Sequence, residues 1–216
     1  VDVAAVARMR AAGGILVGKT ATPELATSLC TRSELNGITR NPWNLEYSPG
    51  GSSGGAGAAV AVGMGPLAVS TDGGGSARVP AAACGVLGLK PTLGRVPHES
   101  WPFHFSNNSS VALNTRTVED MIEMLAIMSG PHPLDPWSRR PSSELDRSQV
   151  ADGVSWLGDR RMLFIESPAG LTPDRDLLGV LDALLTSLAG AGAEVKRAPG
   201  DPTEFDPAMV VRFLTP

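Results

Sequence analysis

The sequence has few of the residues on which several classes of protein depend. Its two cysteines, Cys30 and Cys84, cannot build a disulfide framework and indicate a reducing, cytoplasmic setting. Its three histidines are scattered along the chain, so we expect no metal site. The net charge is -4 and no run of basic residues occurs, which argues against nucleic-acid binding.

Long hydrophobic runs are also missing. The longest weakly polar run, Ala56 to Val69, is interrupted by Gly63, Gly65 and Pro66. It is shorter than the roughly 18 apolar residues of a membrane span. The sequence starts at Val1 without a Met, a basic region or an apolar signal segment, so we expect a soluble chain with a cut edge at that point.

Enough apolar residues remain to build a packed core. They make up 42% of the 216 residues, against 19% charged residues, and this length fits one large domain or a part of one. Helical and strand-like hydrophobic patterns alternate, which predicts an α/β fold. The expected helices lie at 3–10, from Pro23 onward, and at 56–62, 118–128 and 174–189, and the expected strands at 15–17, 67–70, 86–89, 162–165 and 193–196.

The helix after Thr117 has the clearest pattern. Thr117 followed by acidic residues is typical of a helix N-cap. Met121, Met124 and Met128 recur on one face of the helix, so we expect this methionine stripe in the core.

The first candidate motif is a phosphate loop at residues 13–20, which match G-x-x-x-x-G-K-[ST] letter for letter. A phosphate cradle needs a flexible turn after a strand and a helix that starts at the lysine. Here the strand is expected at 15–17, inside the motif, and a proline follows soon after Lys19. We therefore interpret Lys19 as a structural residue at a strand end and predict no nucleotide binding.

A glycine-rich segment is a stronger candidate. Residues 41–77 carry only two charged side chains, Glu46 and Asp72, and 13 of the 25 glycines lie between Gly50 and Gly94. This pattern predicts a mostly buried segment whose backbone approaches its neighbours closely. Residues 50–55, Gly-Gly-Ser-Ser-Gly-Gly, have the composition of a linker but lead directly into an apolar run.

A second loop presents another serine. Residues 71–78 read Thr-Asp-Gly-Gly-Gly-Ser-Ala-Arg, so Ser76 directly follows three glycines. Successive glycine N–H groups can converge on one oxygen, as in a backbone oxyanion hole, and the serine can attack the carbonyl held there. For either loop alone, a tight structural turn is the alternative.

Together these segments resemble the amidase signature family of serine hydrolases. The similarity is dense from about Gly13 to Asp135 and thinner over 155–200, so we expect 1–216 to be part of a single amidase signature domain. The resemblance implies a mixed β-sheet flanked by helices, incomplete in this chain. The matching residues are 18–20, 41–44, 50–55, 71–78, 80–81, 84–85, 88–92, 94–96 and 116–120.

The resemblance implies a Ser–cis-Ser–Lys triad. Ser76 corresponds to the acyl-forming nucleophile, and Ser52, in a cis peptide, to the bridging serine 24 residues earlier (76 minus 52). A neutral lysine takes a proton from Ser52, which takes one from Ser76. The implied oxyanion hole is made by the N–H groups of Gly73, Gly74, Gly75 and Ser76, and the implied loop supports are Ser53, Thr71, Asp72 and Arg78.

The implied reaction hydrolyses a small-molecule amide and needs neither a metal nor an organic cofactor. The family's catalytic lysine, however, lies upstream of the Gly-Lys-Thr motif. This chain has only Lys19 and Lys90, which match structural motif positions, and Lys196, in the weakly similar part. We therefore expect an internal fragment of an amidase that lacks the lysine segment and the C-terminal part, and that is catalytically silent by itself.

Two other functions stay open. The glutaminase subunit of a tRNA-dependent amidotransferase typically carries Thr-Gly-Gly-Ser-Ile-Arg-Gln where residues 73–79 read Gly-Gly-Gly-Ser-Ala-Arg-Val, which favours a stand-alone amidase. A catalytically dead scaffold is disfavoured by the intact Ser52 and Ser76. The sequence specifies neither the amide nor the oligomeric state, and it allows a homo-oligomer.

Overall fold

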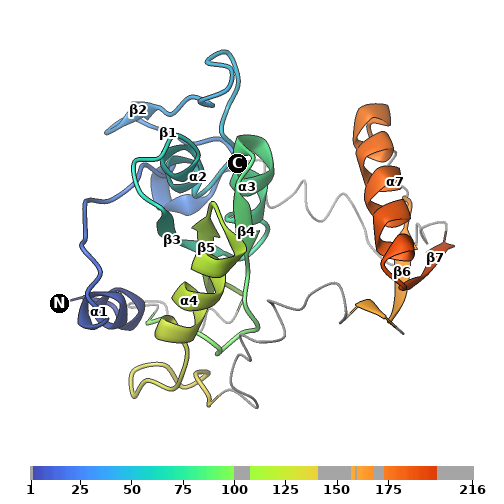
Figure 1. Cartoon of the computed structure of the whole chain (residues 1–216). Helices are drawn as coiled ribbons and strands as arrows, with labels where there is room; N and C mark the ends of the chain where they lie inside the picture. Colours follow the sequence, from blue (N-terminus) through green and yellow to red (C-terminus); the bar gives the residue numbers. More distant parts are fainter. Residues whose placement is uncertain (1, 100–107, 141–156, 159, 168–172, 199–216) are drawn as a thin grey trace. The chain divides into compact units, whose positions relative to one another are not determined.

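The chain divides into two compact units, Val1–Leu145 and Asp146–Pro216, which are described separately. The structure is a computed structural model that describes residues 2–99, 108–140, 157–158, 160–167 and 173–198. The first unit contains α1 (Ala4–Ala11), the 3-10 turn η1 (Glu24–Ala26), β1 (Arg32–Ser33), β2 (Gly37–Ile38), α2 (Gly54–Ala61), β3 (Leu67–Asp72), α3 (Arg78–Cys84), β4 (Leu87–Leu89), β5 (Ser110–Thr115) and α4 (Val118–Met128) (Figure 1).

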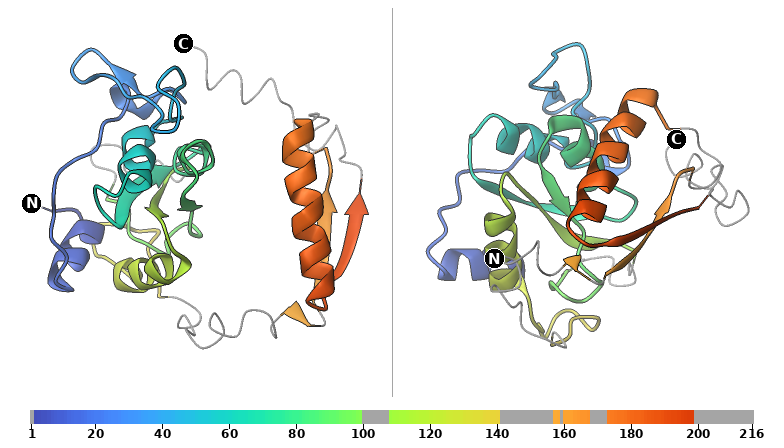
Figure 2. Two further views of the ribbon diagram at one scale, coloured as in Figure 1. Left: turned by 45° about the horizontal axis from the view of Figure 1, so that its top comes forward. Right: turned by 45° about the vertical axis from the view of Figure 1, so that its right-hand side comes forward.

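A three-stranded antiparallel sheet with the order β3-β5-β4 organises this first unit. All six residues of the central strand β5 are buried. Alternate residues of a strand point to opposite faces, so Val111 and Leu113 pack with the methionines of α4, whereas Asn114 reaches the start of α3. Helices α2 and α3 accordingly cover one face of the sheet, and α4 with α1 covers the other (Figures 1 and 2).

Helix α4 has the predicted cap and the predicted buried stripe. The Thr117 hydroxyl accepts a hydrogen bond of 3.1 Å from the N–H of Asp120. Met121, Met124 and Met128 lie in the hydrophobic core. Both predictions for this helix are therefore confirmed.

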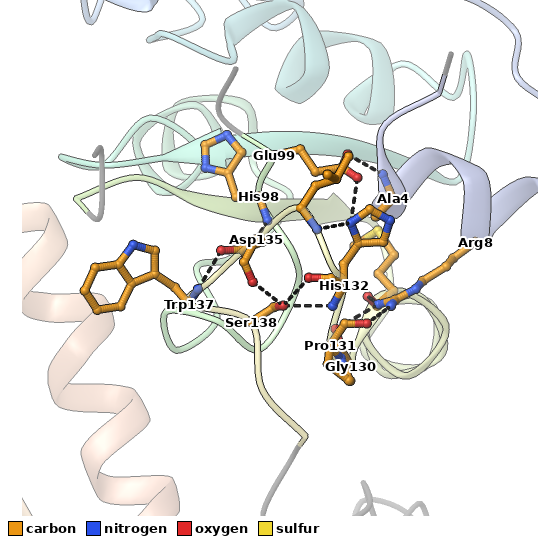
Figure 3. A network of polar contacts seen from close by, with 12 residues as sticks. Ala4, Arg8, His98, Glu99, Gly130, Pro131, His132, Asp135, Trp137 and Ser138 are labelled. Carbon is orange, nitrogen blue, oxygen red and sulfur yellow. Dashed lines mark hydrogen bonds and ion pairs between the residues drawn. The ribbon is translucent and has the colours of Figure 1, made fainter. Parts of the chain in front are cut away.

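Polar contacts fix α1 to the segments around α4 (Figure 3). The Arg8 guanidinium donates to the carbonyl oxygen of Met128 at 2.6 Å, at the C-terminal end of α4. The N–H of Ala4 donates to Glu99 at 2.7 Å, and the other carboxylate oxygen of Glu99 contacts Nδ1 of His132 at 2.9 Å. These contacts attach α1 to the C-terminal end of α4 and to the segments that contain Glu99 and His132.

Two sequence predictions fail in the segment between α1 and residues 50–55, the double-serine loop. Residues 15–17 form no strand, and Ile15 and Val17 are 89% and 86% exposed, because no described strand offers them a backbone partner. The helix predicted from Pro23 is only the turn η1, in which Leu25 and Ala26 have positive φ values of 52° and 57°. The segment instead contacts the double-serine loop, where the carbonyl oxygen of Ala21 accepts a hydrogen bond from the N–H of Gly55 at 3.1 Å.

The burial predicted for residues 41–77 is also only partly correct. Trp43 and Tyr47 are 71% and 66% exposed, although the double-serine loop is buried as expected. Strand β5 was not predicted at all, because its sequence Ser-Val-Ala-Leu-Asn-Thr mixes polar and apolar residues on both faces.

The second unit is the predicted β-α-β arrangement. It contains β6 (Arg161–Ile165), α7 (Arg175–Gly190) and β7 (Glu194–Ala198), with the two strands parallel (Figure 2). The Asp174 side chain caps α7 by accepting from the N–H of Asp176. The α/β fold class is confirmed, while the assignment of the whole chain to a single domain stays a prediction.

Candidate active site

The double-serine loop, residues 50–55, leads into α2 and is packed inside the first unit. Ser52 and Ser53 are only 1% and 3% exposed, which excludes a solvated linker. The peptide bond between Gly51 and Ser52 is cis, the geometry that the family resemblance implies. A Cβ at residue 51 would lie 2.6 Å from the carbonyl oxygen of Ser28, so only glycine fits there.

Thr31, which the sequence did not single out, holds this loop from the side of β1. It is 2% exposed. Its hydroxyl donates to the carbonyl oxygen of Gly50 at 2.8 Å and accepts from the N–H of Gly54 at 3.1 Å. An isolated threonine before a short strand gives no sequence signal, because these contacts join segments that are distant along the chain.

The turn that carries Ser76 connects β3 to α3 and is built around Asp72. The Asp72 side chain is fully buried and accepts from the N–H groups of Gly75 at 2.8 Å and Ala77 at 3.1 Å. Arg78 completes the arrangement, since its Nε and Nη2 donate to the two carboxylate oxygens at 2.9 and 2.8 Å. The carboxylate therefore determines the shape of the turn around the candidate nucleophile.

These contacts also decide the charge of Asp72. Burial raises the pKa of its carboxyl, but the hydrogen bonds from Arg78, Gly75 and Ala77 outweigh this effect and lower the pKa from 3.8 to about 2. The hydrogen bond to Asp72 in turn raises the pKa of Arg78. The pair is thus ionised over the whole neutral range and stabilises the turn as a buried carboxylate with its counterion.

The structure brings the two serine loops into direct contact. The N–H of Ser53 donates to the carbonyl oxygen of Ser76 at 3.0 Å, and its hydroxyl donates to the carbonyl oxygen of Thr71 at 3.3 Å. Ser76 is half-buried and follows the exposed Gly73 and Gly74. The loop of Ser52 and the turn of Ser76 therefore meet through the contacts of Ser53, with Ser52 buried and Ser76 half-buried.

The backbone N–H groups around Ser76 differ in what they contact. Within the part of the chain that the structure describes, those of Gly73, Gly74 and Ser76 have no intramolecular acceptor. The N–H of Gly75 differs from the prediction, because it already donates to Asp72. Three of the four N–H groups of the expected oxyanion hole therefore have no acceptor among the described residues, and the oxyanion hole itself stays a prediction.

A buried polar network lies beneath the turn. The Ser70 hydroxyl of β3 donates to Oδ1 of Asn114 at 2.5 Å. The amide nitrogen of Asn114 donates to the carbonyl oxygen of Ala77 at 3.1 Å, one residue beyond Ser76. Asn114 was not predicted, because β5 itself was missed. Its side chain links β5 to the backbone of Ala77, next to Ser76.

None of the three lysines is hydrogen-bonded to Ser52 or Ser76. Lys90 donates to the carbonyl oxygen of Pro91 at 3.0 Å, Lys196 pairs with Glu194 in the second unit, and Lys19 is exposed. The described residues also include no group of three or more potential metal ligands. Among their helices, none is long and apolar enough to cross a membrane.

With this geometry in place, comparison with known proteins identifies the family. The model of the Amidase family matches residues 1–214, and the chain therefore belongs to the amidase signature family. It is 41% identical over 203 residues to an acylamidase of Rhodococcus erythropolis, across 91% of this chain and 41% of that protein. It is 40% identical over 197 residues to a glutamyl-tRNA(Gln) amidotransferase subunit of Roseiflexus castenholzii (strain DSM 13941 / HLO8), across 90% of this chain and 39% of that protein.

A solved structure supports the same assignment. The fold matches a bacterial aryl acylamidase of the amidase signature family with a TM-score of 0.81 and 32% sequence identity, over 92% of this chain and 40% of that one. The chain thus spans about two fifths of the length of these relatives.

Proposed function

We propose that the complete protein hydrolyses a carboxylic amide to the acid and ammonia or an amine, through an acyl-enzyme on Ser76. The observation that carries this proposal is the burial and the hydrogen bonding of the turn from Gly73 to Ser76. A half-buried serine stands there beside exposed N–H groups that have no acceptor among the described residues, and a second serine loop is hydrogen-bonded to it. That is the arrangement which acyl transfer requires.

In the proposed first half-reaction, Oγ of Ser76 attacks the amide carbonyl carbon. The carbonyl oxygen becomes negatively charged and is held by the N–H groups of Gly73, Gly74 and Ser76. The proton of Ser76 passes to Ser52, whose own proton passes to a neutral lysine supplied by the part of the protein beyond this chain. The lysine's proton then returns by the same route to the departing amine, which leaves the acyl group on Ser76.

In the second half-reaction, water attacks the acyl-enzyme. It gives a proton to the same relay, which returns it to Oγ of Ser76 as the bond between Oγ and the acyl carbon breaks and the acid is released. One preorganised oxyanion donor contributes about 10²- to 10³-fold to such rates, and a general base typically about 10²- to 10⁴-fold. The present chain contains the donors and Ser76 but none of its lysines contacts the serines, so we propose that it is silent without the rest of the protein.

Two relatives suggest different substrates. The acylamidase and the amidotransferase protein are almost equally similar to this chain. The segment Gly73-Gly74-Gly75-Ser76-Ala77-Arg78-Val79 supports a stand-alone amidase, for which an N-acyl anilide is a suitable first substrate. The proposed cytoplasmic setting rests on cysteine usage alone, and the oligomeric state stays open.

The test is hydrolysis of an N-acyl anilide by the complete protein, without tRNA or partner subunits. We expect turnover that is lost in Ser76→Ala. Glutamine-dependent ammonia release that requires added partner subunits, with no anilide cleavage, would favour the amidotransferase alternative. Equal turnover by wild type and Ser76→Ala would contradict the proposed chemistry.

A further inference from the structure

The hydroxyl of Thr31 bridges the two ends of the loop that carries Ser52. We propose that Thr31 is a positioning residue, whose hydroxyl fixes the backbone on both sides of Ser52 and thereby keeps that serine in line for proton transfer. This inference rests on the proposed function, since it assigns a task to the same site. Thr31 touches neither Ser76 nor the open side of the turn in any described hydrogen bond.

The contacts of Thr31 bracket Ser52 symmetrically. A hydroxyl has one proton to donate, and it goes to the carbonyl oxygen of Gly50 at 2.8 Å, two residues before Ser52. The hydroxyl oxygen accepts from the N–H of Gly54 at 3.1 Å, two residues after Ser52. The carbonyl oxygen of Ser52 itself lies at 3.5 Å from the same atom.

Burial makes these two hydrogen bonds hard to replace. Gly50, Gly54 and Thr31 are all buried, so water does not readily substitute for the hydroxyl. A Cβ at residue 54 would overlap Oγ1 of Thr31, so glycine at this position is what allows the hydroxyl to approach the backbone.

Thr31 is itself held from the other side. Its carbonyl oxygen accepts from the N–H of Thr39 at 3.0 Å, which extends the pairing of β1 with β2. The backbone of Thr31 is therefore paired with the β1–β2 hairpin, while its hydroxyl is bonded to the double-serine loop. Reacting groups that are misplaced by about 1 Å can lose about 10²-fold in rate, so a small shift of Ser52 is sufficient to slow acylation.

The test compares two substitutions of Thr31 in the complete protein. Thr31→Val keeps the shape but removes the hydroxyl, whereas Thr31→Ser keeps the hydroxyl. We expect Thr31→Val to lower kcat for the anilide by about 10- to 100-fold with little change in KM, and Thr31→Ser to stay near the wild-type value. The same pattern is expected for the rate at which a fluorophosphonate reacts with Ser76.

Thr115→Val is the matched control. Thr115 is also fully buried, and its hydroxyl donates to the carbonyl oxygen of Thr117 at 2.8 Å, away from the double-serine loop. We expect this variant to lower the melting temperature while kcat per folded molecule stays close to wild type. A loss of kcat in Thr115→Val equal to that in Thr31→Val would overturn the positioning role.

The outcomes separate this inference from the proposed function. An active wild type, an inactive Ser76→Ala and a fully active Thr31→Val would refute only the role of Thr31. Turnover that is insensitive to Ser76→Ala would refute the proposed function. If Thr31→Val does not fold, Thr31→Ala and Thr31→Ser decide instead, and equal kcat values in these two variants would contradict the positioning role.

Discussion

The backbone N–H of Ser53 donates a hydrogen bond of 3.0 Å to the carbonyl oxygen of Ser76. Two loops that are distant in the sequence are thus joined through main-chain atoms. The substitutions Ser52→Ala and Ser76→Ala therefore each remove a hydroxyl but leave this backbone hydrogen bond in place. Serine-to-alanine variants at this site can consequently be interpreted as changes in chemistry.

Ser52→Ala tests the relay by this logic. In the complete protein we expect kcat for an amide substrate to fall by about 10²- to 10⁴-fold, because the nucleophile loses its proton acceptor. Steady-state kinetics, with the melting temperature as a check on folding, measures the effect. Wild-type kcat in Ser52→Ala would remove Ser52 from the relay.

Asp72→Asn tests the electrostatics of the turn. The pKa of Asp72 is lowered to about 2 in the folded chain, so its ionisation stabilises the fold above pH 4, and this contribution is lost as the pH falls from about 4 to 2. The shift corresponds to about 2 kcal/mol at neutral pH. The difference in unfolding free energy between wild type and Asp72→Asn should therefore shrink with acidification over this range, which urea unfolding at several pH values measures. A difference independent of pH would contradict the assignment.

Ser70→Ala tests the network beneath the turn. It leaves Oδ1 of Asn114 buried without its donor, so we expect the free energy of unfolding to fall by about 1–3 kcal/mol. A cycle with Asn114→Leu should be non-additive, because the two side chains share one hydrogen bond. Additive effects in urea unfolding of the four proteins would show that the bond contributes nothing.

Lys19 provides a negative prediction. It is exposed, and no helix begins at it, so residues 13–20 lack the structure of a phosphate loop. Calorimetric titration with ATP or GTP and Mg²⁺ should therefore detect no saturable binding. A micromolar signal that disappears in Lys19→Ala would reverse this interpretation.

The sequence predicted the parts of the fold that depend on local patterns. The cap at Thr117, the buried methionines of α4 and the β-α-β unit all follow from spacing and capping chemistry. The segment 15–17 failed because apolar residues form a strand only where a partner strand is present. Strand β5 was missed because tertiary packing, not alternation, buries Asn114.

The candidate site shows the same division. Glycine runs and serine spacing pointed to residues 50–55 and 71–78 without any structure. The bonds of the Thr31 hydroxyl depend on where separate segments meet, so no sequence pattern could reveal them. The bond from Gly75 to Asp72 is local to one turn, but a run of three glycines does not indicate which N–H group the carboxylate binds.

The central claim is that Ser76 forms the covalent intermediate. The most direct measurement is peptide mass mapping of the complete protein after reaction with a fluorophosphonate, which reports the serine that carries the adduct. We predict a single adduct on Ser76, slower labelling in Ser52→Ala and none in Ser76→Ala. An adduct on another serine, with amide hydrolysis retained in Ser76→Ala, would contradict this account.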